Sequence, residues 1–348
     1  MKTVHNAVKL ALVAWTLGNS SVMTAWAAEA SITLTPSQDT FVTDSPYIPG
    51  SENSSHGSDP ILYAIRGAWG NYTYSLIQFD LSSYAGQNVM GPATLELHIN
   101  GQGCFLRSIP RTISLHEVLI PWDGNATFVN PFSFAAGPTF GFDTDVDAAA
   151  LATREVLYNE PTPYWVSWTI PAEVLQRWID DPASNHGLIV ANEEGANKYD
   201  LTFDSMEDGE HAPRLTLSLN RPPNCSTAAA SVNMLWPPNH ELAAIDVVGV
   251  TDPDGDPVTI TIDEIVQDEP VNGLGDGDVS PDGLGAGDST ALVRAERAGG
   301  GNGRVYAIGF TATDGKGGSC SGVVTVGVPH KRGGTPVAGD TWYDSTLP

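Results

Sequence analysis

Acidic side chains recur at alternate positions of one short turn, at Asp252, Asp254 and Asp256. Carboxylates at i, i+2 and i+4 offer hard oxygen ligands at the density that Ca²⁺ requires. The segment is not an EF-hand, because Pro257 stands where that loop needs glycine. The open alternative is a turn whose Asp, Pro and Gly residues serve backbone geometry alone. The sequence thus predicts Ca²⁺ as the cofactor, with an ordinary turn as its rival.

A glycine- and aspartate-rich loop follows, in which residues 273–278 are echoed by residues 283–288. Asp276 and Asp278 are its main candidate Ca²⁺ ligands. The echo occurs once and at a spacing of ten residues, so no stacked array of repeats can form. A long flexible loop is the alternative.

Aromatic residues near expected loop tips could bind a sugar. Trp69, Tyr72 and Trp122 offer rings for stacking on sugar C–H faces, and Arg66 is a cation that could meet an acidic sugar. The alternatives are core packing for the rings and a surface ion pair for Arg66.

Catalytic motifs are not found in the sequence. His116-Glu117 is followed by Val118, Leu119 and Ile120, which excludes the H-E-x-x-H zinc motif. A nucleophile elbow, a phosphate-binding loop and a dinucleotide fingerprint are missing too. We therefore expect a protein that is not an enzyme.

The first 27 residues read as a secretory signal peptide. Lys2 and Lys9 supply the basic region, residues 10–17 form a short apolar core, and residues 25–27 (AWA) form a cleavage site. No later apolar stretch is long enough to span a bilayer. We expect a secreted protein that is extracellular or at the cell surface, with the periplasm as the alternative.

The chain is strongly acidic, with 16 Lys and Arg against 41 Asp and Glu and a net charge of −25. Such a surface repels polyanions, so nucleic acid is not an expected partner. In an exported protein, Cys225 and Cys320 could form a disulfide that joins the first and last strands of a domain. Cys104 is left over, and its state stays open.

Many turns and short apolar runs favour β structure, since the chain holds 36 Gly and 25 Pro. Residues 93–99 alternate cleanly, whereas 171–179 have the spacing of an amphipathic helix. Trp165 and Trp168 are expected to share one face of a strand.

The predicted class is all-β, with two antiparallel β-sandwich domains at 31–219 and 221–330 and a flexible tail at 331–348.

The first unit resembles the DNRLRE family of secreted β-sandwich modules, which are related to carbohydrate-binding modules. The likeness is carried by residues 39–42 (DTFV), 76–82 (LIQFDLS), 122–128 (WDGNATF), 203–205 (FDS) and 213–215 (PRL). It implies a jelly-roll-like sandwich that binds a glycan. The chain departs from the family pattern at residues 55–57 (SHG) and at Phe128, which affects the expected ligand site more than the fold.

The second unit resembles bacterial immunoglobulin-like modules of the polycystic-kidney-disease and HYR types. Residues 236–240 (WPPNH), 251–257 (TDPDGDP) and 311–315 (TATDG) carry this likeness. It implies a spacer or adhesive domain.

Together these features predict an exported, non-catalytic carbohydrate-binding protein whose partner is a polysaccharide or a cell-surface glycan. One alternative is a structural or adhesion protein of the cell surface that binds protein partners. A second alternative is a cryptic polysaccharide lyase or hydrolase.

Overall fold

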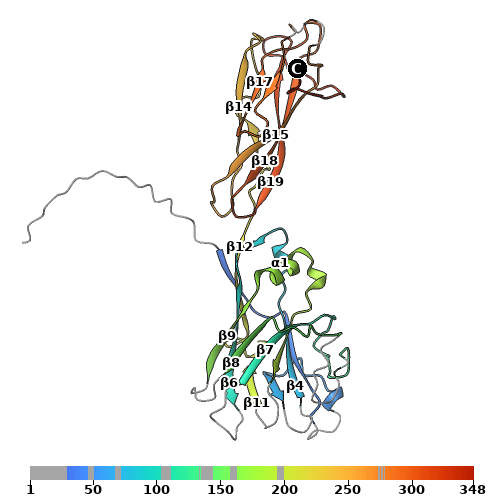
Figure 1. Ribbon diagram of the computed structural model, residues 1–348, viewed down its shortest axis with the longest axis vertical. Helices are drawn as coiled ribbons and strands as arrows, with labels where there is room; N and C mark the ends of the chain where they lie inside the picture. The colour runs from blue at the N-terminus through green and yellow to red at the C-terminus, as the bar shows by residue number, and fades with distance from the viewer. Residues whose placement is uncertain are drawn as a thin grey trace, which may run out of the picture.

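The computed structural model describes residues 30–45, 51–66, 72–102, 111–132, 134, 144–156, 163–193, 200–272, 275, 277 and 279–348. These residues form two bodies of antiparallel sheets that follow one another along the long axis of the molecule (Figure 1). Strands account for 45% of the residues and helices for 8%, so the predicted all-β class is confirmed. No helix within the described ranges is long and apolar enough to cross a membrane.

The first body is a single network of twelve paired strands in the part of the chain that the structure describes. Nine strands follow the order β1-β12-β6-β11-β3-β4-β10-β7-β8, while β2 pairs with β4, β5 with β12 and β9 with β6. Their bounds are β1 (Ala30–Leu34), β2 (Gln38–Thr43), β3 (Ile61–Arg66), β4 (Tyr72–Gln78), β5 (Asn88–Val89), β6 (Ala93–Gln102), β7 (Arg111–Glu117), β8 (Ala152–Val156), β9 (Tyr164–Ile170), β10 (Leu188–Asn192), β11 (Asp200–Asp204) and β12 (Arg214–Asn220).

Alternation builds the main core of this body. Leu95, Leu97 and Ile99 of β6 are fully buried on one face, as the period-two pattern predicts. Trp168 packs into the same core, whereas Trp165 is partly exposed. The expectation that these two residues share a face is therefore wrong, because side chains three positions apart in a strand point to opposite sides of the sheet.

An irregular segment supplies a second core layer. Phe128, Phe132 and Val146 lie in a segment with little regular structure and pack with Leu76 of β4 and Ile189 of β10. The central strands are consequently covered on both faces, and β4 is buried at six of its seven positions. The sequence alone marks this segment only as long and irregular.

The α-helix α1 (Ala172–Asp180) confirms the expected helix at 171–179. Pro171 occupies the N-cap position, where a missing N–H costs nothing. Val174, Leu175, Trp178 and Ile179 form its buried face. Four short 3₁₀ helices complete the described helical structure: η1 (Ser51–Asn53), η2 (Ser82–Tyr84), η3 (Pro182–Ser184) and η4 (Met206–Asp208).

The second body is a sandwich of two four-stranded sheets, with strand orders β13-β14-β17-β16 and β19-β18-β15-β20. Its buried core draws on both sheets, for example Ile245 of β14 and Ile308 of β18. The strands are β13 (Ala229–Ala230), β14 (Leu242–Val248), β15 (Thr259–Gln267), β16 (Gly283–Leu284), β17 (Thr290–Arg294), β18 (Arg304–Thr313), β19 (Ser319–Val328) and β20 (Tyr343–Asp344).

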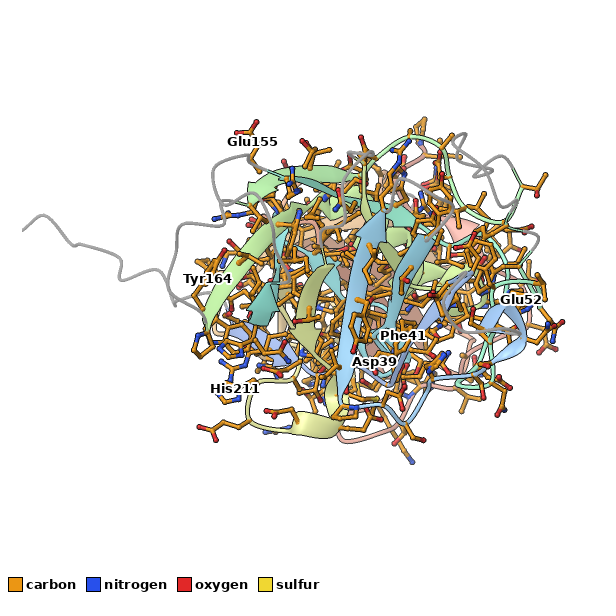
Figure 2. All side chains as sticks on the ribbon, turned by 90° about the horizontal axis from the view of Figure 1, so that it is seen from below. Asp39, Phe41, Glu52, Glu155, Tyr164 and His211 are labelled. Atoms are coloured by element: carbon orange, nitrogen blue, oxygen red, sulfur yellow. A yellow bond between two sulfur atoms is a disulfide. The ribbon has the colours of Figure 1, made fainter. Side chains whose placement is uncertain are left out.

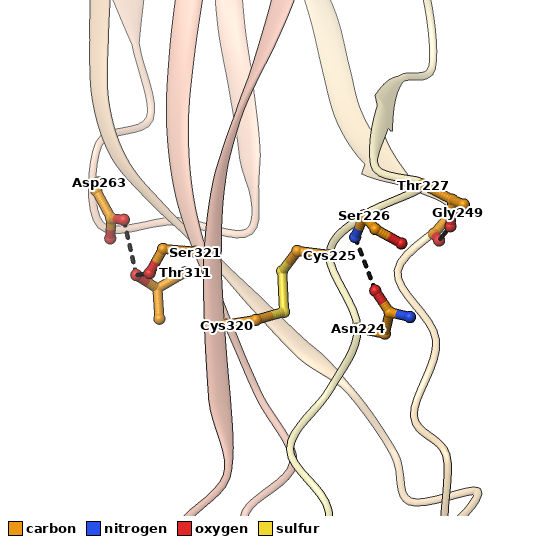
Figure 3. Close-up of a disulfide and its surroundings, with 9 residues drawn as sticks. All are labelled: Asn224, Cys225, Ser226, Thr227, Gly249, Asp263, Thr311, Cys320 and Ser321. Atoms are coloured by element: carbon orange, nitrogen blue, oxygen red, sulfur yellow. Dashed lines mark hydrogen bonds between the residues drawn. A yellow bond between two sulfur atoms is a disulfide. The ribbon is translucent and has the colours of Figure 1, made fainter. Parts of the chain in front are cut away.

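The predicted disulfide between Cys225 and Cys320 is present, and it spans a sequence separation of 95 residues. It joins the segment that enters the second body to strand β19 (Figure 3). Cys104 lies outside the described residues.

The end of the chain is not a loose tail, which corrects the prediction of a flexible segment at 331–348. Strand β20 pairs with β15, and Ser345 is completely buried. The Ser345 N–H donates to the carbonyl of Ile265, and its carbonyl accepts the N–H groups of Asp282 and Gly283. Composition suggested disorder, but backbone hydrogen bonds to the sandwich edge fix this segment.

The two bodies meet at a short junction held by side chains. Asn220 ends β12, and its Nδ2 donates to Oδ2 of Asp314 at 2.7 Å, with both residues buried. Arg221 donates to Asp254 three times, from its backbone N–H, Nε and Nη2, at 2.7, 2.9 and 2.7 Å. These hydrogen bonds thus attach the segment after β12 to the second body.

Candidate functional site

A small pocket lies at the end of the first body that faces away from the junction. Its volume is about 270 Å³, and it is lined by Phe41, Thr43, Ser45, Ser51, Ser54, His56, Tyr63, Ile65 and Thr73. Strand pairing gives the position of the pocket. Strand β6 begins beside β12, which leads to the junction, and it ends beside the start of β11. The start of β11 in turn pairs with β3 at Ile65, which lines the pocket. The pocket therefore sits opposite the second body.

Three rings form its apolar wall. The Phe41 ring stacks on the His56 imidazole with centroids 3.9 Å apart, and Tyr63 meets Phe41 edge-on at 4.9 Å. Phe41 lies on β2 beside Asp39, seen from below the first body in Figure 2. Phe41 is itself only 7% exposed, so the partly exposed rings of His56 and Tyr63 are the ones that could meet the C–H face of a sugar.

His56 also carries a buried polar atom next to this wall. Its Nδ1 is paired with Oδ2 of Asp59 at 2.7 Å. Its Nε2 is buried and has no hydrogen-bond partner among the described residues. A buried polar atom left unpaired is costly, and a ligand hydroxyl that bonds to it would remove that cost.

Serine and threonine residues line the remaining wall, and hydrogen bonds link several of them. Thr43 and Thr73 share a hydrogen bond of 2.8 Å between their Oγ1 atoms. Ser51 Oγ donates to the carbonyl of Ser45 at 3.0 Å, and the Ser45 N–H donates to Thr43 Oγ1 at 3.2 Å. These bonds hold the two strands and the 3₁₀ turn η1 in a fixed arrangement around the pocket.

Asp39 is the carboxyl group near the pocket whose acidity is most altered among the described residues. Burial raises its pKa to about 7, although the hydrogen bond from the Met206 N–H opposes this rise. Asp39 is not among the lining residues, and its Oδ2 is occupied by that N–H at 2.7 Å. The Asp39 carboxyl therefore holds the loop after β11 in place through this hydrogen bond.

The predicted sugar-binding residues do not form this pocket. Trp69 lies outside the described residues. Tyr72 and Trp122 are only 6% and 8% exposed and belong to the second core layer, so neither ring can stack on a ligand. Trp122 Nε1 donates to the carbonyl of His186 at 2.7 Å, which fixes it inside. Arg66 ends β3 and donates to the carbonyl of Glu193.

Sequence reasoning missed the pocket because its rings come from separate segments. Phe41 is on β2, His56 follows η1, and Tyr63 is on β3. Side chains in the strands of Phe41 and Tyr63 alternate between the two faces of the sheet. This alternation predicts the face to which each ring points, but not the residue that lies opposite it. Only the fold brings the loop carrying His56 onto Phe41.

The predicted Ca²⁺ residues Asp252, Asp254 and Asp256 do come together, with one oxygen of each within 4.8 Å of the others. Two of them already face cations, since Asp254 binds Arg221 and Asp256 lies 3.0 Å from Nζ of Lys316. The remaining Asp252 caps its own turn, because its Oδ1 accepts the N–H groups of Asp254 and Asp256. Turn geometry and junction contacts thus account for most of the cluster.

Two oxygens of this cluster remain unpaired. Asp252 Oδ2 and Asp256 Oδ2 are buried without a hydrogen-bond partner among the described residues, which fits a cation-binding role. Asp276 and Asp278 lie outside the described residues.

Comparisons with known proteins add no assignment. No family model matches the chain, and a search of curated proteins finds no match.

Proposed function

We propose that this protein is an exported, non-catalytic carbohydrate-binding protein whose glycan enters the pocket beside Phe41, His56 and Tyr63. The resemblance of the first unit to DNRLRE modules supports the proposal. The observation that carries it is the pocket itself, where three rings meet an unpaired buried imidazole nitrogen. Aromatic stacking and a hydrogen bond to His56 Nε2 would together bind one sugar unit.

The second sandwich, in this proposal, acts as a spacer. The pocket lies at the end of the first body opposite the junction. A surface or matrix glycan could then be bound while the second body lies on the side away from it. Secretion to the extracellular space or the cell surface is part of the same proposal, and retention in the periplasm is its alternative.

A glycan array probed with the full mature chain tests this proposal. We expect a saturable hit on a polysaccharide or cell-surface glycan that is weakened about tenfold or more in Tyr63→Ala, since loss of an anchoring ring costs about 1.4 kcal/mol or more. Trp342→Ala is the matched control, because Trp342 is exposed and lies in the second body. If Tyr63→Ala and Trp342→Ala bound the glycan equally well, the pocket would not be the glycan-binding site.

Two other outcomes would favour the alternative functions. A blank array together with self-association or capture of a protein partner supports the structural or adhesion role. Release of reducing ends or unsaturated products from a polysaccharide would make the protein a lyase or hydrolase.

Calcium is proposed at Asp252, Asp254 and Asp256, with the unpaired Oδ2 atoms of Asp252 and Asp256 as support. Ca²⁺ would raise the melting temperature of the second body by mass action, and a chelator would reverse the rise. Asp252→Asn should abolish the effect. A melting temperature that is the same in Ca²⁺ and in chelator would leave the turn without a metal.

A further inference from the structure

A second cluster of polar side chains lies on the outer face of the first body, away from the pocket. His98 projects from β6 directly opposite Trp165 of β9. Asp204 ends the neighbouring strand β11, and the segment that follows folds back so that His211 covers His98. Figure 2 shows His211 and Phe41 in different parts of the same view. This cluster plays no part in the proposed glycan site.

The three groups are close enough to share one ion. One nitrogen of His98, one nitrogen of His211 and one oxygen of Asp204 lie within 4.8 Å of one another. The two imidazole rings stack at 4.3 Å with 17° between their planes. His98 and Asp204 are 6% and 8% exposed, whereas His211 is partly open to solvent. The cluster therefore has a buried floor and an accessible edge.

Carboxylates orient both rings. His98 Nδ1 lies 2.5 Å from Oδ2 of Asp204, and His211 Nδ1 lies 2.9 Å from Oδ1 of Asp208. The other oxygen of Asp204 accepts a hydrogen bond from the Asn100 side chain. The Asp208 carboxylate fixes the His211 tautomer and makes the other ring nitrogen of His211 a better metal ligand. Asp204 belongs to the cluster itself, and its contact with His98 would be exchanged for a bond to the ion.

The loop that carries His211 is braced at several points. Ser205 caps the 3₁₀ turn η4 by accepting the Glu207 N–H, and Asp39 accepts the Met206 N–H. Asp208 Oδ1 accepts the backbone N–H of His211 as well as facing its ring, both at 2.9 Å. The position of His211 over His98 is thus set by the backbone rather than by ring stacking alone.

The surrounding groups limit access to one side. The guanidinium of Arg214 lies over the Trp165 ring at 4.3 Å, and its Nη2 donates to the carbonyl of Glu210 at 2.7 Å. This cation is therefore directed onto an indole and a carbonyl. Asp204 and Asp208 place two carboxylates beside two imidazoles, a charge balance that favours a divalent cation.

We propose that His98, His211 and Asp204 form a site for a divalent transition-metal ion of the Zn²⁺ type. Two imidazole nitrogens and one carboxylate oxygen are a donor set that suits Zn²⁺ and its neighbours, whereas Ca²⁺ and Mg²⁺ prefer oxygen ligands alone. The exposed edge at His211 leaves the fourth position to water. Bound metal would tie the loop after β11 to strand β6.

The test is isothermal titration of the untagged full chain with Zn²⁺ after treatment with chelator. We expect one ion to bind with a dissociation constant in the micromolar range or tighter, and His211→Gln to weaken binding at least tenfold. His211 is chosen because it is partly exposed and the variant should fold, which circular dichroism can check. His330→Gln, an exposed histidine of the second body, is the matched control and should bind as the parent chain does.

Two further measurements test whether the ion binds at the histidine cluster. Asp252→Asn should leave Zn²⁺ binding unchanged, because that carboxylate belongs to the separate cluster in the second body. Co²⁺ should give visible ligand-field absorption in the parent chain that disappears in His211→Gln. Absence of Zn²⁺ binding, or identical titrations and Co²⁺ spectra for the parent chain and His211→Gln, would overturn the proposal.

Discussion

At the scale of single residues, the second body contains a buried charge network around Arg304. Arg304 is completely buried and donates to Asp282 at 2.7 Å and to Glu269 at 3.1 Å. Burial by itself would lower the pKa of Arg304, but Tyr306 and the carboxylates around it raise that pKa above its ordinary value. The network is stable only while all its members are present.

Arg304→Met should therefore destabilise the second body by about 3–5 kcal/mol, because the buried Asp282 and Glu296 would lose their completely buried cation. Of the basic side chains in the described residues, Asp282 would keep only Arg294 at 3.4 Å, and Glu296 would keep only His240 at 2.8 Å. Denaturant unfolding followed by circular dichroism measures the change. Arg332→Met makes the same chemical change at an exposed position and should alter stability by less than about 0.5 kcal/mol. Equal stability of the two variants would mean that the network contributes nothing.

Asp39 gives a prediction about pH. Its pKa is raised from 3.8 to about 7 in the folded chain, so between these values the folded state binds more protons than the unfolded state. The free energy of unfolding must then fall as pH rises through this window. The expected loss from about pH 5 to about pH 8 is about 2–3 kcal/mol.

Asp39→Asn should remove this loss, since an amide keeps an oxygen for the Met206 N–H and carries no charge at any pH. Unfolding curves at several pH values for both chains give the comparison. Asp80→Asn is the control, because hydrogen bonds from Ser82 lower the pKa of Asp80 and it titrates below the window. A parent chain whose pH profile matches that of Asp39→Asn would contradict the assignment.

At the scale of elements, the sequence predicts what depends on local periodicity. Strand β6 and helix α1 follow from the spacing of their apolar residues. Tyr72 is buried because the irregular segment around Phe128 covers its strand, and Trp122 is buried as part of that segment. The periodicity of the sequence does not report this layer. The pocket and the histidine cluster depend on contacts such as Phe41 with His56 or His98 with His211, which only the fold creates.

Strand β20 supports a further prediction. A chain that ends after residue 342 lacks the Ser345 carbonyl, so the N–H groups of Asp282 and Gly283 lose their acceptor. Together with the lost bond from Ser345 to Ile265, the expected cost is about 3 kcal/mol in the second body, measured by thermal or denaturant unfolding. A chain that ends after Thr346 keeps these bonds and should match the full chain. Equal stability of the two truncated chains would show that β20 adds nothing.

At the scale of the whole molecule, the two bodies are joined by the short junction around Asn220 and Arg221. Gly318 lies against it: a Cβ there would sit 2.1 Å from Oδ2 of Asp314, 2.8 Å from Cα of Pro222 and 3.0 Å from Nδ2 of Asn220. Any larger residue must displace the bond between Asn220 and Asp314.

Gly318→Ala should accordingly separate the bodies at their contact. We expect a broader distribution of dimensions in small-angle scattering and a loss of about 1–3 kcal/mol from overpacking. Gly300→Ala is the control, since a Cβ at Gly300 meets nothing within 4 Å. Scattering curves that coincide for the two variants would show that the junction does not depend on this close approach.

The position of the disulfide has a mechanical consequence. Strand β12 runs into the junction, and Cys225 follows only a few residues later. A pulling force that arrives along β12 would pass through the sulfur atoms from Cys225 straight to Cys320. The residues between the two cysteines are thereby shielded from extension, and only those after Cys320 can be drawn out. Under load the disulfide would keep strands β13 to β18 from being extended.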